Sequence, residues 1–153
     1  MQYHLAIKYL PHDTPMVMIQ DVHLIDEENC ICSVNVSKNG ILAPFLTPQH
    51  TLSNVYVIEL MAQTIGVWNG YHGLKNNHQC QLGMLLGGRA IKMELAKFET
   101  DSTLMIHAKL VLTDTKLANF DCQISVDDVT VATGKLNVYE PDHLELEQLV
   151  SRK

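Results

Sequence analysis

The chain has 153 residues, of which 46% are hydrophobic and 18% charged, so it can bury one substantial core but is too short for two ordinary domains. We therefore expect one domain spanning residues 1–153. The formal net charge of −6 gives no general attraction to nucleic acid or to anionic lipid, because both favour a basic surface.

The N-terminus and the cysteines indicate a cytoplasmic protein. Residues 1–8 lack a basic stretch followed by an apolar one, and no segment approaches the roughly 18 continuous apolar residues that a membrane span needs. The four cysteines form no Cys-x-x-Cys pair, which favours reduced cysteines that pack in the core. We expect neither a signal peptide nor a membrane span.

The first part of the chain predicts a stiff loop followed by a β-hairpin. Residues 1–10 form a short amphipathic start, and prolines bound the turn over 10–15, which places His12 on a fixed loop. Residues 16–24 and 30–36 are rich in β-branched and apolar residues, with an acidic turn between them.

A long apolar helix is predicted next. Residues 38–52 have the composition of a loop, and Ser53 or Asn54 can cap a helix that begins at Val55 and ends near Gly70. Apolar residues are spread around most of its circumference and leave no wide polar face for solvent. We therefore expect this helix to be buried.

The second half of the chain predicts strands. Residues 79–139 alternate between apolar and polar positions, which predicts four strands, and turns at 113–115 and 127–128 arrange the last three as a meander. A short helix is expected over 142–150. The whole order gives an α+β fold in which an antiparallel sheet wraps around one long buried helix, the hotdog arrangement. Alternating βα units are absent from the pattern, which argues against a doubly wound parallel sheet.

Glu59 lies in the second turn of the apolar helix, where an unpaired buried carboxylate would be costly. Gln63 is one turn further on, so its amide can hydrogen-bond the carboxyl group. Burial would favour the protonated carboxyl group, which could then serve as a general acid near neutral pH. The alternatives are a narrow wet stripe on the helix and an ion pair with a nearby lysine.

The remaining residues suggest few other sites. The eight histidines form no His-x-x-x-His or similar pair, so no metal site is predicted. His12, which the prolines hold, and His50, on the loop before the helix, are equal candidates for a catalytic role, although most lone histidines are structural or solvated. Gly87 and Gly88 lie in an expected strand and allow close approach of a ligand or partner strand, with a β-bulge as the alternative. Serine hydrolase and nucleotide-binding motifs are not found in the sequence.

Two segments carry a resemblance to a known family. Leu-Pro-His-Asp-Thr-Pro-Met over 10–16 and Ile-Glu-Leu-Met-Ala-Gln over 58–63 resemble the 3-hydroxyacyl-acyl carrier protein dehydratases, and the likeness continues through 87–92, 121–126 and 131–135. The housekeeping members carry a catalytic histidine in a Gly-His-Phe-Pro-Gly loop, at a position occupied here by Phe45. The chain is more similar to the divergent branch of aryl polyene biosynthesis, which shows Ala-Pro-Phe in that loop and a closely similar helix.

The resemblance implies a dehydratase that converts 3-hydroxyacyl thioesters to trans-2-enoyl thioesters in fatty acid or aryl polyene type synthesis. It raises His12 above His50 as the base and makes Glu59 the acid. The proposed supporting groups, which would orient the acid and hold the thioester oxygen, are Gln63 and the backbone amides near Asn54 and Val55. No cofactor is required.

The resemblance also implies partners. The substrate would arrive on an acyl carrier protein, and the working unit would be a homodimer or a heterodimer with a related hotdog subunit. A carrier protein is expected to be acidic, so Arg89, Lys92 and Lys97 are candidates for receiving it, with Gly88 near the substrate. A solvated strand edge is the alternative for these lysines and the arginine. Two other functions stay open: a hotdog acyl thioesterase, and a non-catalytic subunit that completes another protein's active site.

Overall fold

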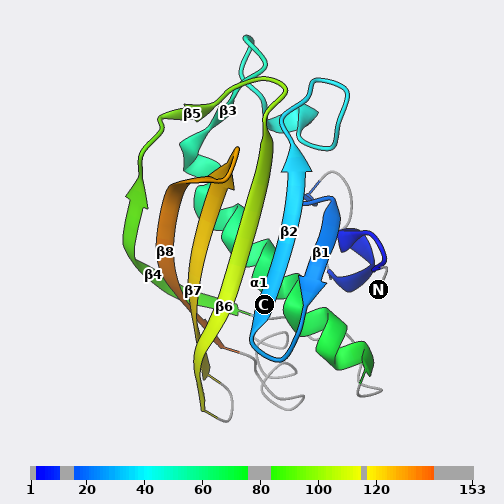
Figure 1. Cartoon of the computed structure of the whole chain (residues 1–153), viewed down its shortest axis with the longest axis vertical. Coiled ribbons are helices and arrows are strands. Elements are labelled where there is room, and N and C mark those ends of the chain that lie inside the picture. The colour runs from blue at the N-terminus through cyan, green and yellow to red at the C-terminus, as the bar shows by residue number, and fades with distance from the viewer. Residues whose placement is uncertain (1–2, 11–15, 76–83, 115–116, 140–153) are drawn as a thin grey trace, which may run out of the picture.

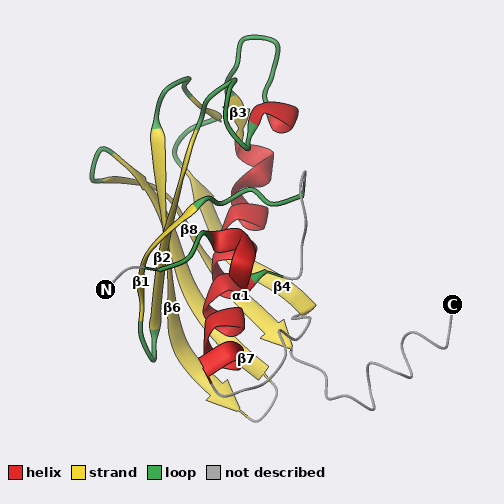
Figure 2. Cartoon of the chain, turned by 90° about the vertical axis from the view of Figure 1, so that its right-hand side faces the viewer, coloured by secondary structure: helices red, strands yellow, loops and turns green. Residues whose placement is uncertain are grey.

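A six-stranded antiparallel sheet carries one long helix against one of its faces (Figures 1 and 2). This computed structural model describes residues 3–10, 16–75, 84–114 and 117–139. The expected C-terminal helix over 142–150 lies outside the described residues. The elements in chain order are η1 (Ala6–Tyr9), β1 (Asp21–Ile25), β2 (Asn29–Asn35), η2 (Ala43–Phe45), β3 (Leu52–Ser53), η3 (Asn54–Tyr56), α1 (Val57–Lys75), β4 (Met84–Met93), β5 (Lys97–Phe98), β6 (Thr103–Asp114), β7 (Leu117–Val126) and β8 (Val129–Tyr139).

The strand order is β1-β2-β6-β7-β8-β4, so the strands before the helix join those after it through the β2–β6 pair. A separate short pair, β3 and β5, lies near the start of the helix. The α+β hotdog prediction is confirmed.

Alternation along the strands separates an inner face, against the helix, from an outer face. On β6 the inward residues Leu104, Ile106 and Ala108 are fully buried, whereas His107 is half-buried and Lys109 is exposed. Burial of this kind contributes about 25 cal/mol for each Å² of apolar surface, so the inner face and the helix supply the core. The described elements leave the outer face uncovered (Figure 2).

Helix α1 runs further than predicted, to Lys75 in place of Gly70, and begins after a single 3-10 turn. Ser53 caps that turn, because its side-chain oxygen accepts a hydrogen bond from the Val55 amide at 3.3 Å.

The prediction of a wholly buried helix is wrong on one side. Leu60, Met61 and Val67 are fully buried against the sheet, but Glu59 is exposed. The sheet covers only the side of the helix that faces it, so apolar residues around the rest of the circumference do not become buried within one chain. None of the helices in the described ranges has the length and apolarity needed to cross a membrane.

Strand β1 begins at Asp21, later than the predicted start at 16. The Met18 amide donates a hydrogen bond to the side chain of Gln63 at 2.7 Å and not to a neighbouring strand. Residues 16–18 are therefore fastened to the helix before the chain enters the sheet.

Candidate functional site

The side chain of Gln63 joins the helix to the chain that follows the 11–15 segment. Its Oε1 accepts a hydrogen bond from the Met18 amide at 2.7 Å, and its Nε2 donates to the Met16 carbonyl at 2.9 Å and to Glu59 Oε1 at 2.8 Å. Gln63 is 1% exposed, so these bonds lie away from water. The hydrogen bond between Glu59 and Gln63 that the i+4 spacing predicts is present.

The bonding pattern of Gln63 fixes the direction of its amide. Only the oxygen can accept from the Met18 amide, so the nitrogen must be the end that faces Glu59. Both hydrogens of that nitrogen are used, one by the Met16 carbonyl and one by Glu59 Oε1. Glu59 Oε1 is thereby an acceptor, and a proton on this carboxyl group would sit on Oε2.

Glu59 lies in the first turn of α1, where the helix dipole favours a carboxylate. Its exposure in the single chain contradicts the expectation of a desolvated carboxyl group. Any shielding of Glu59 from water therefore has to come from outside the described part of this chain.

The segment before His12 also packs on the helix. Tyr9 and Leu10 lie over two glycines one helical turn apart: a β-carbon at Gly70 would come 1.8 Å from the Tyr9 carbonyl oxygen, and one at Gly66 would come 2.8 Å from Leu10 Cδ2. Only glycine lets the chain approach so closely at position 70. The sequence interpretation missed this packing, although small residues four apart on a helix are a signal for it.

His12 itself lies outside the described residues, together with the rest of 11–15. The described residues on either side of this segment, Leu10 and Met16, contact the helix at Gly66 and Gln63 respectively.

The alternative base, His50, is exposed and has a positive φ of 64° in the loop before β3. Its amide donates to the Thr47 carbonyl at 2.8 Å and its carbonyl accepts from Thr100 at 2.5 Å, so backbone bonds define its turn. Among the described residues, no hydrogen bond joins His50 to Glu59.

Phe45 is the residue that the sequence resemblance places where the housekeeping dehydratases carry a histidine. It ends η2 and packs edge-on against Tyr56, with 5.5 Å between the ring centroids. The Phe45 side chain therefore makes an apolar contact next to the start of α1.

The amides expected to hold a thioester oxygen are already donors. The Asn54 amide bonds the Ala96 carbonyl at 3.0 Å, and the Asn54 side chain bonds the Leu95 carbonyl at 3.1 Å. The Val55 amide makes only the long 3.3 Å bond to Ser53, and Val55 is 71% exposed.

Gly88, Arg89 and Lys92 lie on β4, at the edge of the sheet, and all three are exposed. The pairing of β4 with β8 shifts register twice, between Leu85 and Gly87 and between Arg89 and Lys92. Gly87 and Gly88 themselves pair in register with Asn137 and Leu136, so the two irregularities flank the glycine pair, and the role of the pair stays a prediction.

The other half of α1 holds the β1–β2 turn. Trp68 Nε1 and His72 Nε2 both lie against the Asp26 carbonyl oxygen, at 3.1 and 2.9 Å. A carbonyl only accepts, so His72 carries its hydrogen on Nε2. These donors explain a tryptophan and a histidine on an apolar helix without any catalytic role.

The described cysteines pack in the core, as predicted. Cys30, Cys32 and Cys122 are buried and free, and burial raises the pKa of the Cys122 thiol to about 12. Cys80 lies outside the described residues. Within the described ranges, no group of three or more His, Cys, Asp or Glu side chains is placed to hold a metal ion.

Comparison with known proteins finds similarity to dehydratases. Residues 5–151 match the family described as ApeP-like, ApeP dehydratase. The dehydratase heterocomplex ApeI:P from Xenorhabdus doucetiae contains a chain of 40% identity, which superposes with a TM-score of 0.91 over 97% of this chain and 99% of that one.

Two proteins of lower sequence identity are also similar to this chain. The 3-hydroxyacyl-acyl-carrier-protein dehydratase FabZ of Acinetobacter baumannii is 23% identical over 97% of this chain and 99% of its own length. A hypothetical thioesterase from Streptococcus pneumoniae, solved with coenzyme A, has a TM-score of 0.61 at 15% identity over 79% of this chain and 84% of that one, which shows the shared fold alone.

Proposed function

The chain belongs to the ApeP-like dehydratase family, and from this premise we propose how its residues dehydrate a 3-hydroxyacyl thioester to a 2-enoyl thioester. The observation that carries the proposal is the set of three hydrogen bonds made by Gln63. One buried amide holds the Glu59 carboxyl group and the backbone that leads from His12.

Glu59 is the general acid in this proposal. Gln63 donates to Oε1, so the transferable proton resides on Oε2 and is given to the C3 hydroxyl group as the C3–O bond breaks and water leaves. The acid lies on an exposed side of the helix, where a substrate can reach it.

His12 is the base that takes the C2 proton, so that the electrons of the C2–H bond form the new double bond. His12 follows Leu10 by two residues in the sequence. Leu10 lies against Gly66, less than one turn from Gln63, which supports His12 over His50. The Phe45–Tyr56 contact supports the same choice, since no histidine stands at the family's usual position.

The Val55 amide is the better donor for the thioester oxygen. It is exposed and makes one long bond to its own cap, whereas the Asn54 amide is engaged with Ala96. Charge develops on the thioester oxygen as the C2 proton leaves, and a donor at the start of a helix stabilises that charge.

The proposed substrate is carried by an acyl carrier protein, which fits the name of the FabZ relatives. The proposed working unit is a heterodimer with a related hotdog subunit, as in the ApeI:P complex, or else a homodimer. A second subunit would shield the exposed side of α1 that bears Glu59 and Val55.

Mass analysis of the carrier after incubation with a 3-hydroxyacyl carrier protein tests the proposal. The enzyme, alone or co-purified with a related hotdog subunit, should remove one water and leave the acyl group attached. Free acid together with unacylated carrier would establish a thioesterase instead. If Glu59→Gln and His12→Gln in this chain left the rate of the mixed complex unchanged, this chain would be the non-catalytic subunit.

A further inference from the structure

The inner face of the edge strand β4 is partly uncovered, unlike that of its neighbour β8. On β8, Ala132 and Leu136 are buried. Their partners on β4, Met93 and Gly88, are exposed although they lie on the same face of the sheet. The described elements therefore cover β8 here and leave an apolar margin of β4 open beside the helix.

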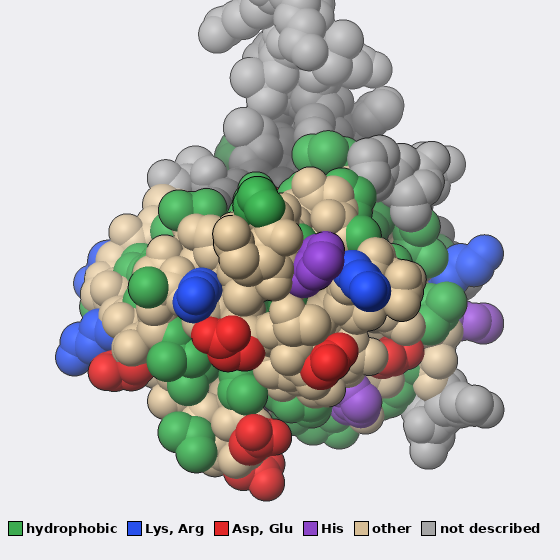
Figure 3. Space-filling view, turned by 90° about the horizontal axis from the view of Figure 1, so that it is seen from above, with side chains coloured by type: hydrophobic (Ala, Val, Ile, Leu, Met, Phe, Trp, Pro, Cys, Tyr) green, Lys and Arg blue, Asp and Glu red, His purple; other side chains and the backbone are tan. Residues whose placement is uncertain are grey.

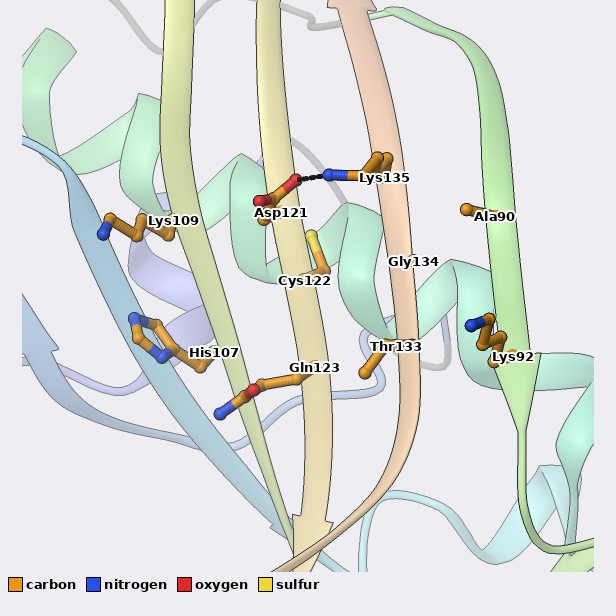
Figure 4. A pocket seen from close by; sticks show the side chains of 10 residues that line it. All are labelled: Ala90, Lys92, His107, Lys109, Asp121, Cys122, Gln123, Thr133, Gly134 and Lys135. Carbon is orange, nitrogen blue, oxygen red and sulfur yellow. Dashed lines mark hydrogen bonds and ion pairs between the residues drawn. The ribbon is translucent and has the colours of Figure 1, made fainter.

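Ile91 lies on this margin and packs down onto the sheet. The register shift sets two residues of β4, Ala90 and Ile91, opposite the single Gly134 of β8, and Ala90 has a positive φ of 53°. A β-carbon at Gly134 would lie 2.5 Å from Ile91 Cδ1 and 3.4 Å from Met61 Sδ of α1. Ile91 thus turns toward the helix, whereas Ala90 and Lys92 line a pocket on the outer face (Figure 4).

Two glycines make the seat on which Ile91 rests. A β-carbon at Gly88 would lie 3.3 Å from Ile91 Cδ1, and the one at Gly134 would come closer still, at 2.5 Å. The atom in the way is the end of a flexible side chain, so a methyl group at Gly134 would move Ile91 and not the backbone. The absence of a side chain at Gly134 therefore sets how far Ile91 stands out from the sheet.

The surroundings of Glu59 close off several directions for an acyl chain. In the proposed mechanism the thioester oxygen lies toward the start of the helix. The side of the helix at Gln63 is occupied by the backbone that this residue binds. One turn beyond Glu59 on the helix, Leu10 lies over Gly66. At the end of the molecule near β3 and β5, acidic and basic side chains are interspersed, which does not suit an apolar tail (Figure 3).

The remaining direction leads around the helix toward β4. Ile58 and Ala62 are half-buried apolar residues that pack against the core beside Glu59. At about 100° per residue, they lie between Glu59 and Met61 on the circumference of the helix. An acyl tail that starts at Glu59 therefore crosses these apolar residues and reaches the place where Ile91 stands next to Met61.

We propose that Ile91 determines the length of the acyl chain that this protein accepts. A short tail ends before Ile91, and a longer one meets its side chain at the margin of β4. The inference rests on the proposed function, which places the C3 hydroxyl group of the substrate at Glu59. Ile91 is a specificity-determining residue and takes no part in the proton transfers.

Binding of saturated acyl-pantetheine amides of increasing chain length tests the proposal by calorimetry. The protein is used intact, alone or co-purified with a related hotdog subunit. Affinity for the wild type should rise about fourfold per methylene group and then level off where the tail meets Ile91. Ile91→Ala should move this levelling point to chains longer by about two methylene groups, because the shortened side chain leaves room for them.

Gly134→Ala should have the opposite effect. The added methyl group displaces Ile91 from its seat, so the levelling point should move to shorter chains. In the Ile91→Ala background the same change should lose its effect, since no Cδ1 is left to displace. Ile31→Ala is the matched control. It makes the same substitution at a half-buried position on the outer face, opposite His107, and should keep the wild-type profile.

An unchanged length profile in Ile91→Ala would overturn the proposal, as would an equal shift in Ile31→Ala or a failure of every amide to bind. The amides undergo no dehydration, so these results are separate from turnover. A protein that shows the expected profiles but leaves a 3-hydroxyacyl thioester intact would overturn the proposed chemistry and support the role of Ile91.

Discussion

The inner and outer sides of this molecule hold their polar groups in opposite ways. Gln63, on the inner side, is buried and neutral, and its three hydrogen bonds use the oxygen and both hydrogens of its amide. Lys109 and Lys135, on the outer face, are charged and exposed, and only Lys135 has a described ion pair.

This difference sets what each region can do. A buried polar group that loses its partner cannot turn to water, so the bonds of Gln63 fix a geometry. Exposed charges are screened by solvent and their side chains stay mobile, so Lys109 and Lys135 can exchange partners without disturbing the fold. Substitutions on the two sides should therefore differ in kind, and four of them test that difference.

The largest effect is expected for Glu59→Gln. Removal of the transferable proton should lower the rate of dehydration roughly 100- to 10,000-fold, while the free energy of unfolding changes little because the side chain is exposed. Formation of the 2-enoyl thioester measures the rate. Glu28→Gln, an equally exposed carboxylate in the β1–β2 turn, is the control and should keep full activity. Wild-type activity in Glu59→Gln would remove this carboxyl group from the mechanism.

The second-largest effect is expected for Gln63→Leu. It leaves the Met18 amide and the Met16 carbonyl without their partner, and we expect a loss of roughly 2–4 kcal/mol in the free energy of unfolding. Urea denaturation measures this loss. The same substitution at exposed Gln123, on the outer face, should cost less than about 0.5 kcal/mol. Similar losses at both positions would contradict the contrast between the two sides.

The third-largest effect is expected for Gly70→Ala. The added methyl group would lie 1.8 Å from the Tyr9 carbonyl oxygen, so η1 must move, at a cost of about 1–3 kcal/mol. Activity should fall with it, since η1 leads into the segment that carries His12. Gly87→Ala is the control, because nothing lies within 4 Å of a β-carbon there. Thermal unfolding and turnover should separate the two variants, and identical behaviour would show that the contact between η1 and α1 is dispensable.

The smallest effect concerns His107 on the outer face. Its pKa is lowered by burial and by the charge of Lys109, partly offset by Asp26. The unfolded chain therefore binds a proton more readily than the folded one, and stability should fall as the pH drops below the ordinary histidine value of about 6.5. Urea unfolding of the wild type and of His107→Gln between about pH 7.5 and pH 5.5 measures the difference. A wild-type protein that loses no more stability than His107→Gln would contradict the lowered pKa.

The sequence predicted the fold because its patterns are local. Alternation over 79–139 identified the long strands, and the apolar helix with its Ser53 cap was found within a few residues of its start. The Glu59–Gln63 bond followed from i+4 spacing for the same reason. The family assignment is also confirmed. The functional roles of the candidate site residues stay predictions: His12, Asn54, Val55, Glu59, Gln63, Gly88, Arg89 and Lys92.

What the sequence could not predict depends on contacts between distant segments. The backbone of Met18 lies 45 residues from Gln63 in the chain, and no local pattern joins the two. The exposure of Glu59 was missed because hydrophobic periodicity alone does not say which side of a helix the rest of the chain covers. The ion pair between Lys135 and Asp121 on the outer face depends on the register of β7 and β8, which cannot be read from the sequence.

The hydrogen bonds of Gln63 to residues 16 and 18 involve the main chain and not the side chains of these residues. Such a contact is indifferent to which amino acid occupies the position, provided that its backbone can follow the same path. Met16, which is 57% exposed, can therefore be replaced by other residues while the Glu59 carboxyl group keeps its hydrogen bond to Gln63. The orientation of the Glu59 carboxyl group is thereby insulated from side-chain variation in the segment that leads into the sheet.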